Sequence, residues 1–332
     1  MNQIKVDWGL KEDPLPADYF DLIGGTSTGG LIALLLGRLR LSVPEARTEF
    51  TRIVQHVFTL ERRVKVLINI PLLGPYVKRE IFDERRLEAA VRRVLVARLG
   101  QGRGDEKLFD RSDGRCRVFV CAKVLQVADA PRLFRTYDAS GTEPSDCRIW
   151  EACRATMAAP AYFKGINIGV ESERETFVGA GLGCNDPIQE VLAEARRVFP
   201  AYRKIACAVS IGTGTKRAPK ARSGLPLTTR RKAIERLEAF ATSEDDKAQA
   251  GAKFDKASEA YFRLNVDGCL GSVGLENWRE LGQVRSLTTR YLDQNEVSDQ
   301  IRKIAKVLVA QDSSSGASLE SSPRVHRRRR TV

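Results

Sequence analysis

Histidine is nearly absent from this sequence, because its 332 residues contain only two, His56 and His326. This scarcity excludes most histidine-rich metal sites and leaves few ways to build a catalytic triad around a histidine base. His56 falls within a predicted helix and His326 lies among arginines. We therefore interpret both as structural or exposed side chains.

Long apolar runs and paired cysteines are also missing. No stretch of about 18 apolar residues occurs, so we expect no membrane span, and the N-terminus is charged where a signal peptide would be apolar. The cysteines form no C-x-x-C pair and their number is odd, which favours buried or free thiols in a reducing compartment. We expect a cytoplasmic protein, with peripheral membrane contact as an alternative. The cysteines are residues 116, 121, 147, 153, 184, 207 and 269.

Acidic residues are too few to balance the basic ones, since 42 Asp and Glu stand against 55 Lys and Arg, giving a formal net charge of +13. Residues 216–232 hold seven of the basic side chains and no acid, and residues 324–330 hold five arginines. Both segments favour contact with an anionic lipid surface or nucleic acid; the alternative is a solvated loop and a disordered tail. No aromatic residues are interleaved with them, so nucleic acid ranks last.

Hydrophobic periodicity and turn residues predict alternating helices and strands. This order predicts an α/β domain with a largely parallel sheet and helices on both faces. We divide the chain into a domain over 1–215, a basic linker and helical extension over 216–310, and a disordered basic tail over 311–332. Helices are expected over 31–40, 42–60, 84–99, 150–158 and 187–198, and strands over 19–23, 117–124, 132–137, 176–178 and 204–211.

Several predicted helix starts carry capping signals. Ser42 and Glu45 have the spacing of a capping box, and Asp83 can cap the helix that follows it. Asp186 precedes Pro187, a favoured first helical residue, so we expect Asp186 to be a helix N-cap.

Residues 25–29 read Gly-Thr-Ser-Thr-Gly, a G-x-S-x-G pattern between a predicted strand and an apolar helix. A serine that presents its hydroxyl at a sheet edge sits on a sharp strand-to-helix turn, where flanking glycines relieve crowding. The positive end of the next helix favours developing negative charge. Ser27 is the candidate nucleophile, with Gly25, Thr26, Thr28 and Gly29 as its elbow; the alternative is a turn without chemistry.

A serine nucleophile needs a base, and neither histidine is well placed to serve. The remaining route is activation by a carboxylate, in a Ser-Asp dyad.

Several ordered segments resemble patatin-like phospholipases of the fungal type, and together they cover roughly residues 15–295. The resemblance implies a three-layer patatin-like fold with a central, mostly parallel sheet and a helical C-terminal part. The segments are DYFDLIGGTSTGGLIALLLGRLR (18–40), IWEACRATMAAPAYF (149–163), FVGAGLGCNDP (177–187), VSIGTGT (209–215) and YFRLNV (261–266).

The resemblance implies a lipid acyl hydrolase that acts on a lipid or membrane-surface ester. In that family a serine attacks the ester carbonyl, an aspartate takes its proton, and a glycine-rich loop holds the oxyanion. An acyl-enzyme forms and water releases the fatty acid, without metal or cofactor. Carried onto this sequence, the nucleophile is Ser27.

The sequence departs from the family pattern in two places. Gly179 stands where the resemblance places the dyad aspartate, and no glycine-rich loop precedes Ser27. Loss of a triad member costs about 10⁴ in kcat and loss of one oxyanion donor about 10²–10³. Asp186 is a weak substitute. We therefore keep two hypotheses, an active lipid acyl hydrolase and a catalytically impaired protein that keeps the fold and binds lipid.

Other polar or bulky residues of these segments have structural interpretations. Arg154 could hold an anion or form an ion pair within the fold, and Asp21 could tie the backbone of the elbow. Met157 and Trp150 are expected in the core. The acids before the second catalytic segment are expected to be solvated; they are Glu171, Glu173 and Glu175.

Overall fold

The computed structural model describes residues 1–59, 82–111, 116–127, 130–139, 141, 146–160, 162–181, 183–214, 260–266, 273 and 277–314. Its α-helices are α1 (Asn2–Asp7), α2 (Pro16–Tyr19), α3 (Thr28–Ala33), α4 (Val43–Val57), α6 (Glu84–Leu99), α7 (Ile149–Met157), α8 (Ile188–Val198), α11 (Leu281–Leu292) and α12 (Asn295–Ser314). Its strands are β1 (Leu22–Thr26), β2 (Arg117–Val124), β3 (Arg132–Arg135), β4 (Ile166–Ile168), β5 (Glu175–Gly179), β6 (Ala208–Ile211) and β7 (Tyr261–Leu264). A π-helical turn η1 (Leu34–Arg38) extends α3, and short 3₁₀ turns are η3 (Arg103–Asp105), η4 (Glu171–Glu173) and η6 (Trp278–Glu280).

The main sheet is mixed. β1 pairs in parallel with β2, so that Thr26 lies opposite Cys121. β3 and β5 pair antiparallel with β2, and β4 pairs antiparallel with β5. The expectation of a mostly parallel sheet is therefore wrong. The links from β2 to β3 and from β4 to β5 are too short for the crossover that a parallel neighbour needs, and they close antiparallel pairs instead.

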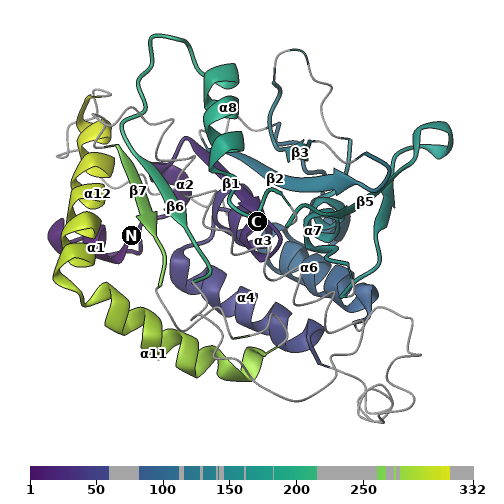
Figure 1. Cartoon of the computed structure of the whole chain (residues 1–332), viewed down its shortest axis with the longest axis horizontal. Coiled ribbons are helices and arrows are strands. Elements are labelled where there is room, and N and C mark those ends of the chain that lie inside the picture. Colours follow the sequence, from purple (N-terminus) through teal and green to yellow (C-terminus); the bar gives the residue numbers. More distant parts are fainter. Residues whose placement is uncertain are drawn as a thin grey trace, which may run out of the picture.

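Helices cover both faces of this sheet, which confirms the α/β class (Figure 1). Alternate residues of β2 point to opposite layers, as a strand requires. Val118, Val120 and Ala122 pack into the large core formed with α3, α4, α6 and α7. Phe119 and Cys121 face the other way, into a smaller cluster with Val191 of α8.

Local signals placed most helices correctly. Ser42 and Glu45 form the predicted capping box of α4. Helix α6 starts after its cap Asp83. The predicted face of α6 is buried throughout: Leu87, Ala90, Val91, Val94 and Leu95.

The strand before Ser27 begins three residues later than predicted. Residues 16–19 form the short helix α2, and β1 runs from Leu22 through Gly24 and Gly25 to Thr26. A methyl group at Gly24 would lie 2.4 Å from the Phe119 ring. The ring on the neighbouring strand leaves no room for a side chain at this position. Glycine is therefore required here, although its propensity for strands is low.

A second, two-stranded sheet pairs β6 with β7 in parallel. Its apolar side packs against the first and last helices, with Ile4 of α1 and Ile304 of α12 beside Phe262. β7 lies in the part expected to be helical, so the extension over 216–310 contains a strand. Helix α12 continues to Ser314, beyond the predicted start of the tail at residue 311.

The described cysteines are all free thiols, as predicted, and five of the six are buried. Burial raises the pKa of Cys116, Cys147 and Cys153 to about 12, so these thiols stay protonated at neutral pH. Cys269 lies outside the described residues. None of the described helices combines the length and the apolar composition needed to cross a membrane.

Candidate functional site

Ser27 occupies the sharp turn between β1 and α3. Its backbone has φ 56° and ψ −126°, a conformation that few residues with a side chain adopt. Apart from Ser27, Arg40 alone among the described non-glycine residues has positive φ. Such strain, held by the surrounding fold, is what the predicted nucleophile elbow would require.

Close packing explains two glycines near Ser27, one in the elbow and one just after it. A methyl group at Gly25 would lie 2.3 Å from the carbonyl oxygen of Gly29. At Gly30 it would lie 2.9 Å from Thr156, whereas at Gly29 it would have no atom within 4 Å. A side chain would therefore clash at Gly25 and at Gly30, whereas the space around Gly29 could hold one.

Thr156 of α7 packs against the elbow and is hydrogen-bonded to it. It is fully buried, and its Oγ1 accepts a hydrogen bond of 2.8 Å from the backbone N–H of Ser27. No sequence pattern indicated a role for this threonine. Its segment resembled the family, but the contact with Ser27 joins residues 129 positions apart.

Gly179 lies in line with Ser27 across the sheet. Thr26 pairs with Cys121, and the next β2 residue, Ala122, pairs with Gly179. Two strand spacings separate the ends of β1 and β5, about 9.5 Å. The main-chain oxygen of Thr156 lies 3.0 Å from the place of a Gly179 Cβ. The same threonine therefore touches both positions that the family pattern assigns to its dyad.

Asp186 is engaged elsewhere. Its carboxylate pairs with Arg263 at 2.7 Å and accepts a hydrogen bond of 3.0 Å from the Ser210 hydroxyl. It also accepts from the backbone N–H of Ile188, in the first turn of α8, at 3.3 Å. Pro187, rather than Asp186, is the N-cap residue. These contacts tie the start of α8 to the second sheet.

Replacing Asp186 by asparagine is expected to lower the free energy of unfolding by about 2 kcal/mol, because Arg263 then loses its partly buried counter-ion. Urea denaturation followed by circular dichroism measures this loss. Asp299→Asn is the matched control, since Asp299 pairs with Arg302 on the surface, where the cost is about 0.5 kcal/mol or less. An unchanged stability together with a loss of activity would instead assign Asp186 to the chemistry.

The other candidates are held within the fold. Asp21 pairs with Arg203 at 2.8 Å rather than with the elbow. Buried Arg154 pairs with Glu88 at 3.3 Å and donates to the carbonyl of Lys164. Glu175 belongs to β5 and pairs with Arg132.

Several candidate residues lie apart from Ser27 or in the core. His56 is exposed in the last turn of α4. Trp150 is partly buried and Met157 fully so, while Glu171 and Glu173 are exposed. Residues 216–232 and 324–330, with His326, lie outside the described part of the chain.

Two thiols lie beside the elbow on the α8 side. Cys184 Sγ is 3.8 Å from the Thr26 hydroxyl. A hydrogen bond with Cys121 and then burial raise the pKa of Cys184 well above its ordinary value. A thiol held protonated cannot take the proton of Ser27, so Cys184 does not replace the missing carboxylate.

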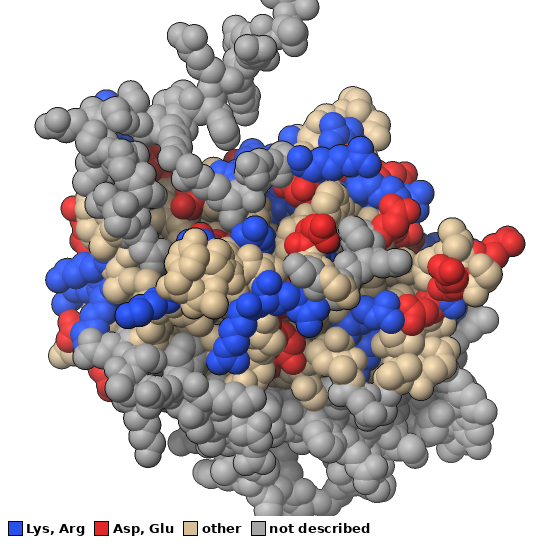
Figure 2. All heavy atoms as spheres, turned by 90° about the horizontal axis from the view of Figure 1, so that it is seen from above, with Lys and Arg blue, Asp and Glu red and all other residues tan. Residues whose placement is uncertain are grey.

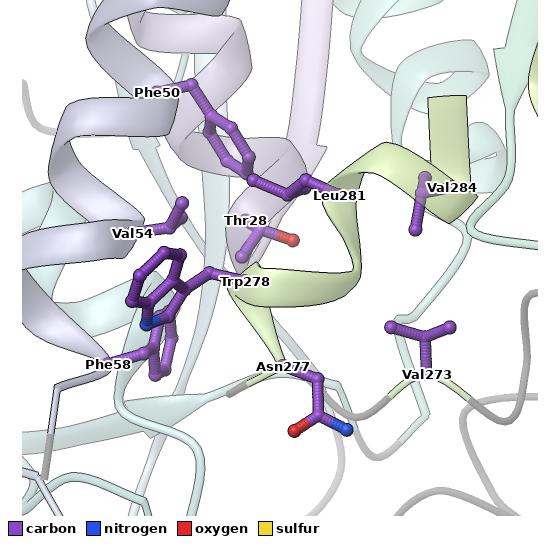
Figure 3. Close-up of a pocket in the computed structure, with 9 residues that line it drawn as sticks. All are labelled: Thr28, Phe50, Val54, Phe58, Val273, Asn277, Trp278, Leu281 and Val284. Atoms are coloured by element: carbon purple, nitrogen blue, oxygen red, sulfur yellow. The ribbon is translucent and has the colours of Figure 1, made fainter. Parts of the chain in front are cut away.

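An apolar cavity of about 110 Å³ opens next to the elbow. Thr28, which follows Ser27, lies among side chains that α4 and the η6–α11 segment contribute (Figure 3). The cavity can accept a short hydrocarbon segment beside the serine. Its lining residues are Thr28, Phe50, Val54, Phe58, Val273, Asn277, Trp278, Leu281 and Val284.

Sequence comparison relates this chain to known phospholipases. The sequence model of the family described as patatin-like phospholipase matches residues 5–192. Calcium-independent phospholipase A2-gamma of Mus musculus is 25% identical over 301 residues, which are 87% of this chain and 36% of that protein. The 85/88 kDa calcium-independent phospholipase A2 of Mus musculus is 27% identical over 207 residues, 59% of this chain and 23% of that protein.

A plant relative carries a different description. "Probable inactive patatin-like protein 9" of Arabidopsis thaliana is 27% identical over 212 residues, 60% of this chain and 50% of that protein. The chain spans about a third of the length of the gamma-type relatives that it matches.

Proposed function

The chain belongs to the patatin-like phospholipase family, and on this basis we propose that it is a lipid acyl hydrolase with Ser27 as its nucleophile. The strained backbone of Ser27 carries the proposal, because a turn without chemistry has no need to hold a serine at φ 56°. Relatives named as calcium-independent phospholipases A2 support a phospholipid ester as substrate.

In the proposed reaction the Ser27 Oγ attacks the ester carbonyl, and the alcohol leaves from a covalent acyl-enzyme. Water then attacks this ester and releases the fatty acid. The acyl chain occupies the cavity beside Thr28. The first N–H groups of α3, beginning with that of Thr28, have no partner within the helix and can donate to the oxyanion.

The proton of Ser27 has no carboxylate acceptor at position 179. Attack by a hydroxyl without a positioned base is slow, so we propose a low turnover. No metal or cofactor takes part in the proposed steps.

A fluorophosphonate probe with an alkyl chain is expected to label the wild-type protein slowly at Ser27, because phosphonylation also requires the hydroxyl to lose its proton and position 179 has no carboxylate to accept it. Ser27→Ala is expected to abolish the label. Mass spectrometry of the modified peptide measures both results. The matched control is Ser42→Ala, which removes the hydroxyl of a helix cap outside the elbow and should leave the label in place. Absence of label in folded wild-type protein contradicts a nucleophilic Ser27.

A second candidate function is lipid binding without turnover. This function is favoured because position 179 has no carboxylate and because Asp186 forms an ion pair with Arg263. A relative named as inactive also favours it. It predicts that lipid bound to the protein is recovered intact after long incubation, with no labelled Ser27.

For the basic segments we propose contact with an anionic lipid surface through residues 216–232 and 324–330, with nucleic acid as the weaker alternative. On the face shown in Figure 2, basic and acidic side chains of the described residues are intermixed. The described residues of that face form no large surface of one sign, which favours these two segments as the candidates for such contact.

A further inference from the structure

We propose that Lys123 is the anion-binding residue of the Ser27 site and holds the phosphate of a glycerophospholipid whose acyl ester lies at Ser27. The inference rests on the proposed function and deepens it, because it separates phospholipids from uncharged acylglycerols as substrates.

The register of the sheet places Lys123 beside the elbow. Thr26 lies opposite Cys121, and Lys123 is the next residue of β2 on the same face as Cys121, toward α8. Lys123 therefore stands where β1 has ended and Ser27 turns away. Its position in β2 is fixed further by pairing with Val178 of β5.

The turn after β5 brings the ammonium group close to the site. Lys123 Nζ lies 3.2 Å from the place of a Gly183 Cβ. The next residue, Cys184, contacts the Thr26 hydroxyl at 3.8 Å, and Thr26 precedes the nucleophile. The ammonium thus lies against the short turn that covers the end of β1.

Lys123 is partly buried, and no hydrogen bond or ion pair joins its side chain to the rest of the described chain. Two arginines of low exposure, by contrast, have carboxylate partners: Arg38 pairs with Glu106 and Asp110, and Arg135 pairs with Glu194. An anionic ligand can supply the counter-ion that this partly buried lysine lacks among the described residues. Lysine is a common point-charge partner of phosphate.

The cavity and the ammonium lie on opposite sides of the nucleophile. Thr28 and the side chains of α4 line the apolar cavity on the large-core side, whereas Lys123 faces α8. A phospholipid can therefore place its acyl chain in the cavity and its headgroup phosphate at Lys123, with the ester between them at Ser27. An uncharged acylglycerol would use the cavity alone.

The test measures binding in a Ser27→Ala background, so that no ligand is consumed. Isothermal titration calorimetry compares dihexanoyl phosphatidylcholine monomers with dihexanoylglycerol, which has the same acyl chains and no phosphate. Lys123→Met is expected to raise the Kd of the phospholipid about tenfold, since a hydrogen bond to a charged group is lost, and to leave the Kd of dihexanoylglycerol unchanged. Lys123→Arg is expected to retain the preference.

The matched control is Lys107→Met, which removes the same charge from a lysine paired with Asp146, and it should alter neither Kd. Thermal unfolding checks that each variant is folded. Equal weakening of both ligands by Lys123→Met, or no weakening, would overturn the assignment. If neither ligand binds the protein with Lys123 intact, the proposed lipid site itself fails, which is a separate result.

Inorganic phosphate distinguishes a lipid headgroup from a free phosphate. We expect it to displace the phospholipid only at concentrations far above the Kd of the phospholipid, because phosphate alone gains nothing from the cavity. Tighter binding of inorganic phosphate than of phospholipid would overturn the assignment of Lys123 to a headgroup.

Discussion

Replacing Gly179 by aspartate is expected to raise the rate of ester hydrolysis about a hundredfold. Loss of a triad member lowers kcat by about 10⁴-fold. A proton acceptor restored at position 179 can therefore raise kcat by a large factor. The register supports the direction: Gly179 lies in line with Ser27, about two strand spacings away, and the two side chains can lean toward one another across β2.

We expect the rate to rise by less than the full factor of about 10⁴, because the new aspartate side chain is crowded. The Gly179 N–H donates to the carbonyl of Ala158 at 2.9 Å, and a Cβ would lie 3.0 Å from the Thr156 oxygen and 3.2 Å from the Ala159 nitrogen. The end of α7 must move by a few tenths of an ångström. We expect this shift to cost about 1 kcal/mol of stability.

Hydrolysis of a chromogenic short-chain ester measures the gain. Gly179→Asn is the matched control, because asparagine has the size of aspartate and cannot accept the proton. The double variant with Ser27→Ala gives the background. A rise that Gly179→Asn reproduces, or one that survives loss of Ser27, would contradict a Ser-Asp dyad at these positions.

Replacing Gly25 by alanine is expected to lower the free energy of unfolding by about 3 kcal/mol. The added methyl group would lie 2.3 Å from the Gly29 oxygen and 2.7 Å from the Gly30 nitrogen. Both are backbone atoms in the first turn of α3 and cannot rotate away. The elbow must open, so Ser27 should also lose its reactivity toward the fluorophosphonate probe.

Gly29→Ala, in the same motif, provides the contrast. No atom lies within 4 Å of its added methyl group, and alanine favours a helix by about 0.8–1.0 kcal/mol over glycine. Stability should be unchanged or slightly higher. Chemical denaturation of both variants measures the difference, and equal destabilisation by the two substitutions would refute the packing account of the elbow.

Sequence patterns located most elements because their signals are local. A capping box at Ser42 and Glu45 satisfies the backbone of its own helix, and the buried face of α6 is visible as an apolar stripe. The three-residue strand β4 gave no comparable signal, and β7 was hidden in a part expected to be helical. Short strands depend on their neighbours for stability, so their own residues indicate them weakly.

Some residues of the candidate site were likewise indicated by sequence patterns, whereas others became apparent only in the structure. The G-x-S-x-G pattern with its flanking strand and helix indicated Ser27 as the candidate nucleophile, and the family resemblance indicated position 179. Thr156 and Lys123 could not be found in this manner. Each acquires its place through partners distant in the chain, Thr156 through a hydrogen bond to Ser27 and Lys123 through β2 and the turn at Gly183.

The sequence by itself determined the family, the candidate nucleophile and the absence of a carboxylate at position 179, because these depend only on which residues stand in which order. The tertiary structure alone decided that Asp186 is engaged by Arg263. It also decided that a side chain could fit at Gly29 and that the end of α7 packs closely against Gly179. Distances between segments far apart in the chain decide such matters, and those distances follow from the pairing of strands and the packing of helices upon them.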